Sequence, residues 1–286
     1  MKLQTKIFID GGSVSETEEA NSTFLSHFGY PLDGQTTNPS LIAKNLKATL
    51  SPGEKLTHER ALEEYKNIVT KISALLPHGS ISIQVFANEQ TPADEILKQA
   101  RERATWIPNG SIKIPCTKEG LKAAQHACQE MPINITLVFS QSQAAAVYEA
   151  TKGAKYPVFI SPFVGRLDDI GQAGMDVVAN MLEMYKSGDG HVEVLTASVR
   201  NVQHILYALS LRSPILTLPF STFSLWRNDG FPTPSENLTH DRGTLSEIPY
   251  SPDIVLGEPW ENYDISHPLT KKGLEAFWSD WESLFS

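Results

Sequence analysis

The chain has 286 residues and a formal net charge of -9 at pH 7, from 24 Lys and Arg against 33 Asp and Glu. No basic tract offsets this acidic balance, so we expect no nucleic-acid partner. The N-terminus lacks an apolar signal core and no apolar run reaches 18 residues, which predicts no membrane partner and a cytoplasmic protein. Two cysteines, Cys116 and Cys128, are too few for a disulfide framework or a zinc site.

Strand-like and helical segments alternate along the chain. Strand patterns occur near residues 6–10, 33–36, 80–87, 111–115, 133–139, 158–161, 191–198 and 215–220. Helical spacing of apolar residues covers 61–76, 92–104, 118–129, 141–152, 170–186 and 202–211. Thr91, before Pro92, and Thr117 are expected N-caps. The alternation predicts an α/β fold, a single closed (β/α)8 TIM barrel over residues 1–286. An open doubly wound sheet is the alternative, but no Gly-x-Gly-x-x-Gly turn follows the first strand.

Residues 221–266 interrupt this rhythm. The segment is rich in Pro, Asn and Asp and has no sustained periodicity, so we predict a long irregular insertion after the eighth strand. It would lie at the C-terminal rim of the barrel, either as a lid or as a simple insertion. Residues 267–286 are predicted as a C-terminal helix, whose apolar face would pack against the barrel or a neighbouring subunit.

One lysine stands in the middle of a predicted strand, at Lys113. Side chains alternate across a strand, so Ile112 and Ile114 share one face while Lys113 is on the other. Two interpretations fit this stretch. Lys113 is a charge that protects an edge strand from aggregation, or it is a buried, partly neutral amine that attacks a carbonyl to form a Schiff base.

Polar side chains occur at the C-terminal ends of nearly all the predicted strands, where a barrel builds its active site. Singly they have ordinary explanations: Asp10 as a turn residue, Asn38 as a helix cap, Arg166 as the partner of Asp168 or Asp169. Together, one lysine, one carboxylate, amides, hydroxyls and two arginines predict a site for a carbonyl and a phosphate. In chain order they are Asp10, Thr36, Thr37, Asn38, Gln84, Lys113, Asn134, Thr136, Ser161, Arg166, Ser198 and Arg200.

Several of these residues lie in motifs that resemble those of the transaldolase family. Thr36-Thr37-Asn38-Pro39-Ser40 is similar to its Thr-Thr-Asn-Pro-Ser motif, and Ile112-Lys113-Ile114-Pro115 resembles its Schiff-base lysine motif. The stretches 134–140, 161–166 and 197–201 resemble later family motifs. The similarity runs in order from residue 6 to about 220. His267-Pro268-Leu269-Thr270 begins a stretch similar to the closing helix of short-chain transaldolases and fructose-6-phosphate aldolases. Residues 221–266 have no counterpart that we assign.

The resemblance implies a barrel enzyme that moves a dihydroxyacetone unit from a ketose phosphate to an aldose phosphate, without a metal or cofactor, in the non-oxidative pentose phosphate branch. It implies a possible homo-oligomer and sugar phosphates as substrates. It also implies roles for individual residues: Lys113 as nucleophile, Asp10 as general base, Thr136 with Gln84 as holders of the catalytic water, and Asn38, Asn134, Ser161, Phe163, Arg166, Ser198 and Arg200 as substrate contacts.

Two positions point to different branches of the family. Phe163 resembles the transaldolase choice, since the aldolase branch usually has a tyrosine there for proton transfer. Gln84 resembles the aldolase branch, since larger transaldolases place a glutamate there, and an amide cannot act as a base. The alternatives are an aldolase that uses free dihydroxyacetone and an inactive sugar-phosphate-binding barrel.

Overall fold

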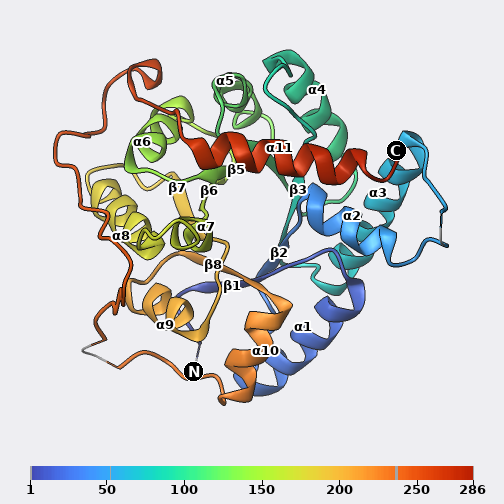
Figure 1. Cartoon of the computed structure of the whole chain (residues 1–286), viewed down its shortest axis with the longest axis horizontal. Helices are drawn as coiled ribbons and strands as arrows, with labels where there is room; N and C mark the ends of the chain where they lie inside the picture. Colours follow the sequence, from blue (N-terminus) through green and yellow to red (C-terminus); the bar gives the residue numbers. More distant parts are fainter. Residues whose placement is uncertain (1, 52, 236–237, 286) are drawn as a thin grey trace.

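The fold is a closed barrel of eight parallel strands, seen in a computed structural model that describes residues 2–51, 53–235 and 238–285 (Figure 1). Each strand pairs with the next along the chain, and β1 pairs with β8 to close the barrel. The predicted TIM barrel is therefore confirmed. Its strands are β1 (Lys6–Asp10), β2 (Gly34–Thr36), β3 (Ser80–Gln84), β4 (Gly110–Pro115), β5 (Ile133–Val138), β6 (Val158–Pro162), β7 (Val192–Thr196) and β8 (Ile215–Pro219).

At least one helix follows every strand. No helix in the described part of the chain has the length and apolar character that crossing a membrane would need. The helices are α1 (Val14–Phe28), α2 (Pro39–Lys47), α3 (His58–Leu75), α4 (Ala93–Ala104), α5 (Lys118–Ala127), α6 (Gln141–Ala150), α7 (Val164–Asp168), α8 (Gly174–Tyr185), α9 (Val202–Ser210), α10 (Phe220–Asn228) and α11 (Pro268–Glu282), with a short 3₁₀ turn η1 (Trp260–Asn262).

Of the two predicted N-caps, one is confirmed and one is wrong. Thr117 accepts a hydrogen bond from the Gly120 N–H at 3.0 Å and caps α5. The residue at the cap of α4 is instead Pro92, without a side-chain bond. The Thr91 hydroxyl instead accepts a hydrogen bond from the Asn88 N–H at 2.9 Å. This local turn competes with capping, so Thr91 does not cap α4.

The predicted irregular segment 221–266 is wrong at its start, where α10 continues from β8. Thr222, Phe223 and Trp226 are the buried side chains of this helix, and Trp226 packs edge to face with Phe231. A helix of two and a half turns with three buried positions is too short for its apolar periodicity to be recognised in the sequence. Residues 229–235 and 238–259 are irregular. Phe231 packs on Trp226 of α10, and the later part passes outside α8 and reaches α6, where the Gly257 N–H donates to Glu149 Oε1 (Figure 1).

The predicted helix at 170–186 begins later, at Gly174. Gly171 adopts a φ of 81°, in the left-handed region, and turns the chain between α7 and α8. The short helix α7 was not predicted, because five residues are too few to show a period.

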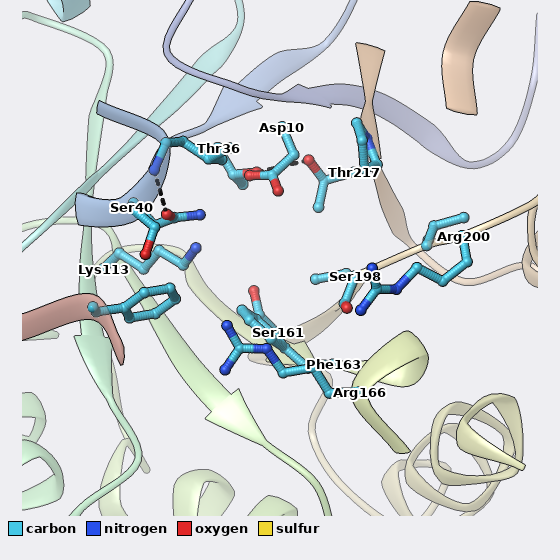
Figure 2. A pocket seen from close by; sticks show the side chains of 16 residues that line it. Asp10, Thr36, Ser40, Lys113, Ser161, Phe163, Arg166, Ser198, Arg200 and Thr217 are labelled. Atoms are coloured by element: carbon cyan, nitrogen blue, oxygen red, sulfur yellow. Dashed lines mark hydrogen bonds between the residues drawn. The ribbon is translucent and has the colours of Figure 1, made fainter. Parts of the chain in front are cut away.

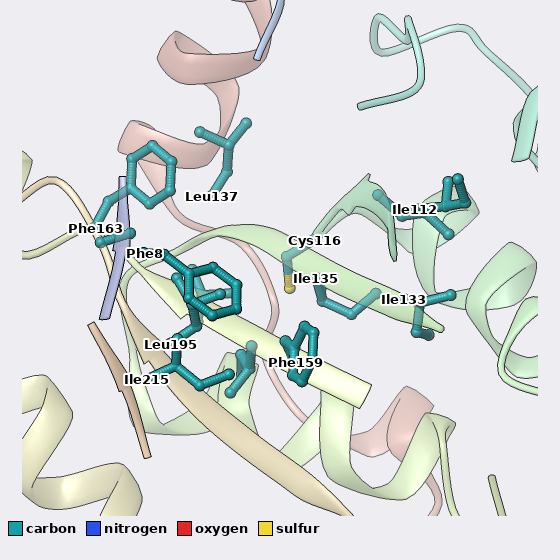
Figure 3. Close-up of a cluster of buried hydrophobic side chains, with 14 of the residues drawn as sticks. Phe8, Ile112, Cys116, Ile133, Ile135, Leu137, Phe159, Phe163, Leu195 and Ile215 are labelled. Atoms are coloured by element: carbon teal, nitrogen blue, oxygen red, sulfur yellow. The ribbon is translucent and has the colours of Figure 1, made fainter. Parts of the chain in front are cut away.

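Apolar side chains lie inside the barrel beneath the polar strand ends, among them Phe8, Phe159, Leu195 and Ile215 (Figure 3). Phe8 is two residues before Asp10 and Phe159 two before Ser161, so each lies on the inward face of its strand, one layer deeper. Gly34 makes room for Phe8, since a Cβ at Gly34 would lie 2.7 Å from the Phe8 ring. The polar residues of the strand ends therefore stand on a packed floor.

The C-terminal helix α11 crosses the end of the barrel, from the side of α6 to that of α2 (Figure 1). Its apolar face packs on the chain's own barrel: Trp281 stacks on Phe86 with ring centroids 4.1 Å apart. Gly273 allows the close approach, since a Cβ there would lie 2.5 Å from Leu137 Cδ2 and 2.6 Å from Arg166 Nη1. The closing helix therefore forms part of the wall around the strand ends.

Candidate active site

Lys113 lies inside the barrel, on β4 between β3 and β5. A closed barrel has no edge strand, so the interpretation of Lys113 as an edge charge is wrong. The residue is 2 % exposed, and its Nζ donates a hydrogen bond to the Thr37 carbonyl at 3.3 Å. Burial lowers the pKa of Lys113 from 10.5 to about 8; the Asp10 carboxylate opposes this shift and the Arg166 guanidinium adds to it. The amine is therefore available as a nucleophile near neutral pH.

Asp10 faces the same cavity as Lys113 from the end of β1 (Figure 2). Its Oδ1 accepts a hydrogen bond from Thr36 Oγ1 at 2.7 Å, and Thr36 Oγ1 lies 2.7 Å from Thr217 Oγ1. Burial raises the pKa of Asp10, against the opposing effects of Lys113, the Thr36 hydrogen bond and Arg166. A carboxylate of raised pKa is a stronger base, which suits proton transfer.

Asn134 is the cross-strand neighbour of Lys113 on β5, and its amide is held from both sides. Asn134 Nδ2 donates to Ser82 Oγ at 3.1 Å, and Ser161 Oγ donates to Asn134 Oδ1 at 2.7 Å. Ser82 was not among the predicted site residues. Its sequence signal is its position two residues before Gln84, on the same face of β3.

Gln84 and Thr136 lie on the strands that flank Lys113 and have buried, unpaired oxygens. Gln84 is the cross-strand neighbour of Lys113, and Thr136 is that of Pro115. Among the described residues, neither Gln84 Oε1 nor Thr136 Oγ1 has a hydrogen-bond partner. Buried polar oxygens are normally satisfied, so these two are suited to bind a water or a substrate group.

A cavity of about 250 Å³ opens at the strand ends (Figure 2). It brings together eight of the eleven residues to which the resemblance assigns a role, whereas the other three, Gln84, Asn134 and Thr136, are buried and do not line it. Asn38 faces the cavity while its Oδ1 caps α2 by accepting from the Leu41 N–H. The lining residues are Asp10, Thr36, Asn38, Ser40, Leu41, Lys113, Ser161, Phe163, Arg166, Ala197, Ser198, Val199, Arg200, Thr217, Pro219 and Phe277.

Arg166 enters this cavity from α7, between two aromatic rings. Its guanidinium carbon lies 5.2 Å from the centroid of Phe163 and 5.3 Å from that of Phe277. Burial lowers the pKa of Arg166, and nearby Arg200 adds to this effect. Two guanidinium groups facing one cavity favour a bound anion.

Arg200 follows β7 and reaches the cavity from the turn beside α7, next to Gly165 (Figure 2). Ser198 adopts a φ of 60°, which turns the chain so that its carbonyl accepts from the Gly165 N–H at 3.0 Å. A Cβ at Gly165 would lie 2.3 Å from Arg200 Nε, so only glycine fits there. Arg200 Nη2 donates to Asp169 Oδ2 at 2.9 Å. The expected pairing of Arg166 with Asp168 or Asp169 is therefore wrong, because Asp169 pairs with Arg200 and Asp168 pairs with a histidine.

Two residues of α11 were missed in the sequence: Phe277, which lines the cavity, and Asp280, which contacts the lining residue Ser40. The Asp280 carboxylate accepts a hydrogen bond from the Ser40 hydroxyl. Thr217, on β8, was also missed. Its signal is its inward position two residues before the end of a strand.

Comparison with known proteins gives the family. The family model described as transaldolase/fructose-6-phosphate aldolase matches residues 7–286. A probable transaldolase of Herpetosiphon aurantiacus is 32 % identical over 280 residues, covering 98 % of this chain and 96 % of the relative. A probable transaldolase of Alkaliphilus metalliredigens is 33 % identical, covering 98 % of this chain and 99 % of the relative. Probable transaldolase 2 of Listeria monocytogenes is 34 % identical, covering 97 % of this chain and 96 % of the relative. The chain therefore belongs to the transaldolase/fructose-6-phosphate aldolase family and is an enzyme of the transaldolase type, a transferase of aldehyde or ketone residues.

Proposed function

We propose that this enzyme transfers a dihydroxyacetone unit from a ketose phosphate, sedoheptulose 7-phosphate or fructose 6-phosphate, to an aldose phosphate through a Schiff base on Lys113. The observation that carries the proposal is the buried Lys113 amine, with a pKa of about 8, in one cavity with Asp10 and two arginines. At pH 7, about one molecule in ten has a neutral Lys113, compared with about one in 3,000 for an ordinary lysine.

The first step is attack of the neutral Lys113 Nζ on the ketone carbon C2 of the donor sugar. Proton transfers give a carbinolamine, which loses water to form an iminium ion. We propose that Thr136 Oγ1 and Gln84 Oε1 hold this water, because both oxygens are buried and neither has a hydrogen-bond partner within the described part of the chain. Both side chains act by hydrogen bonding, since neither titrates near neutral pH.

The second step breaks the C3–C4 bond. The Asp10 carboxylate takes the proton of the C4 hydroxyl, C4 becomes the aldehyde of the leaving aldose phosphate, and the electron pair of the bond moves to the iminium ion. The product on Lys113 is a three-carbon enamine. A second aldose phosphate accepts this unit by the reverse steps, and hydrolysis of the new imine frees the enzyme. The raised pKa of Asp10 supports its role as the base and, in reverse, the acid.

Substrate binding is assigned to the remaining residues of the site. Arg166 and Arg200 would bind the phosphate with Ser198 through charge-assisted hydrogen bonds, and their convergence on one cavity supports this. Asn38 and Asn134 would bind sugar hydroxyls, with Ser161 orienting the Asn134 amide. Phe163 would form a wall, since its ring centroid lies 5.6 Å from Lys113 Nζ.

An aldolase that uses free dihydroxyacetone is the second candidate, and Gln84 favours it as the residue of that branch. Phe163 favours transfer, because it lacks the hydroxyl with which a tyrosine would protonate the enamine and release dihydroxyacetone. Product analysis separates the two. With fructose 6-phosphate and erythrose 4-phosphate, the proposal predicts sedoheptulose 7-phosphate, whereas dihydroxyacetone accumulating from fructose 6-phosphate alone would identify an aldolase.

We also propose that residues 1–286 act as one transaldolase-like unit. The pairing of β1 with β8 and the position of α11 in the cavity wall support this, because both ends of the chain contribute to one site. The reaction would belong to the non-oxidative pentose phosphate branch in the cytoplasm, on the strength of the family. A homo-oligomer would have to use surfaces other than the Trp281 face of α11, which packs on the barrel.

A further inference from the structure

The two arginines of the proposed phosphate site are carried by separate elements that must keep a fixed spacing. Arg166 is on α7, which ends at Asp168. Arg200 is on the turn between β7 and α9, and α9 begins two residues later. An anion can be held by both guanidinium groups only while α7 and this turn stay in register.

His204, in the first turn of α9, bridges these two elements. Its Nε2 lies 3.0 Å from Asp168 Oδ2, and its Nδ1 lies 3.4 Å from the backbone nitrogen of Arg200. The Asp168 side chain is itself fixed, because Oδ1 accepts from the Gly174 N–H at 2.9 Å. The histidine side chain is 9 % exposed. One ring therefore contacts both the end of the Arg166 helix and the backbone of Arg200.

The two contacts of His204 define which tautomer of its imidazole ring is present. The Arg200 N–H is a donor, so Nδ1 must accept and carries no proton. Nε2 then carries the proton and donates it to Asp168. The pKa of Asp168 is lowered: burial raises it, but the hydrogen bonds from His204 and the Gly174 N–H outweigh burial. An ionised Asp168 is the acceptor that this arrangement needs.

We propose that His204 is a positioning residue, which joins α7 to the Arg200 turn and so holds Arg166 and Arg200 at the spacing that binds the substrate phosphate. The inference rests on the phosphate role proposed above. It predicts that His204 affects the binding of phosphorylated substrates without affecting the chemistry at Lys113, which lies on another strand.

The test compares D-glyceraldehyde 3-phosphate with D-glyceraldehyde as acceptor, a pair that differs only in the phosphate. For His204→Ala we expect KM for the phosphorylated acceptor to rise about tenfold, which is the usual effect of losing one charge-assisted hydrogen bond. We expect kcat and the KM for glyceraldehyde to change less than about twofold. The inhibition constant of inorganic phosphate should rise in parallel. His204→Gln keeps a donor for Asp168, and we expect it to recover part of the loss.

A matched control is His191→Gln. His191 makes a similar contact, with Nδ1 2.5 Å from Asp189 Oδ1, but it precedes β7 and so lies at the opposite end of this strand from Arg200. We expect its kinetics to equal those of the wild type. If His204→Ala does not fold, His204→Gln and His204→Asn, which have similar shape, carry the same comparison.

Arg200→Ala, measured alongside, separates this inference from the proposed function. If Arg200→Ala raises KM selectively for the phosphorylated acceptor and the His204 variants do not, the inference is overturned and the phosphate site stands. If Arg200→Ala affects both acceptors equally, the phosphate site itself is overturned and the inference with it. Equal changes for both acceptors in the His204 variants would likewise reject a positioning role.

Discussion

Burial of Lys113 should cost stability, and its replacement by methionine should recover it. The pKa of Lys113 is about 8 in the folded protein, compared with 10.5 for an ordinary lysine. The unfolded chain therefore holds this proton up to about pH 10.5 and the folded protein only to about pH 8, so stability rises with pH between these values. The difference of about 2.5 pH units corresponds to a penalty on the order of 3 kcal/mol that is fully present below pH 8. Lys113→Met has no charge to bury and similar length.

We therefore expect Lys113→Met to raise the free energy of unfolding at pH 7 by about 1–3 kcal/mol, the lower end allowing for the lost partner of Asp10. The gain should shrink to less than about 1 kcal/mol at pH 10. Urea unfolding followed by tryptophan fluorescence at both pH values measures this. Lys66→Met, at an exposed position of α3, is the control and should change little. If Lys113→Met is less stable than the wild type at pH 7, or if its free energy of unfolding changes by the same amount at both pH values, burial of the charged lysine does not cost stability.

Three further predictions address other parts of the site. Asp10→Asn should lower turnover by about 10²–10⁴, the usual range for a general base, while leaving the imine on Lys113 trappable; loss of the imine as well would assign Asp10 another role. Arg200→Ala should raise KM for phosphorylated acceptors about 10- to 100-fold and leave unphosphorylated ones nearly unchanged, as initial rates with both acceptors will show. Gly273→Ala should cost about 1–3 kcal/mol in urea unfolding, because its Cβ would meet Leu137 and Arg166; wild-type stability and kinetics would contradict the close packing of α11.

The barrel and most of its site were predictable because both depend on short-range patterns. The alternation of Ile112 and Ile114 with Lys113 placed the lysine on the face opposite the two isoleucines, and the predicted closed barrel makes that face the inner one, since the outward face of a barrel strand must be apolar to meet the helices. The order of strands then placed Asp10 and Arg166 at the same end as Lys113. Residues that lie far apart in the sequence converge there because parallel strands end on one face.

Contacts between elements distant in the sequence were not predictable. Phe277 reaches the cavity, and Asp280 reaches Ser40 in its lining, only because α11 crosses the barrel end, which depends on Gly273 fitting against Leu137 and Arg166. A single sequence records no such fit. Likewise, the pairing of Arg200 with Asp169 follows from the left-handed turn at Ser198, a conformation that serine seldom adopts.

Borohydride reduction can show whether Lys113 forms a Schiff base with a ketose phosphate, because it converts the imine to a stable amine. The enzyme is incubated with fructose 6-phosphate, reduced with borohydride, digested, and mapped by mass spectrometry, with Lys113→Met treated in parallel. We expect a reduced adduct on the peptide that contains Lys113 and none in the variant. No adduct, or an adduct that persists in Lys113→Met, would contradict a Schiff base on Lys113.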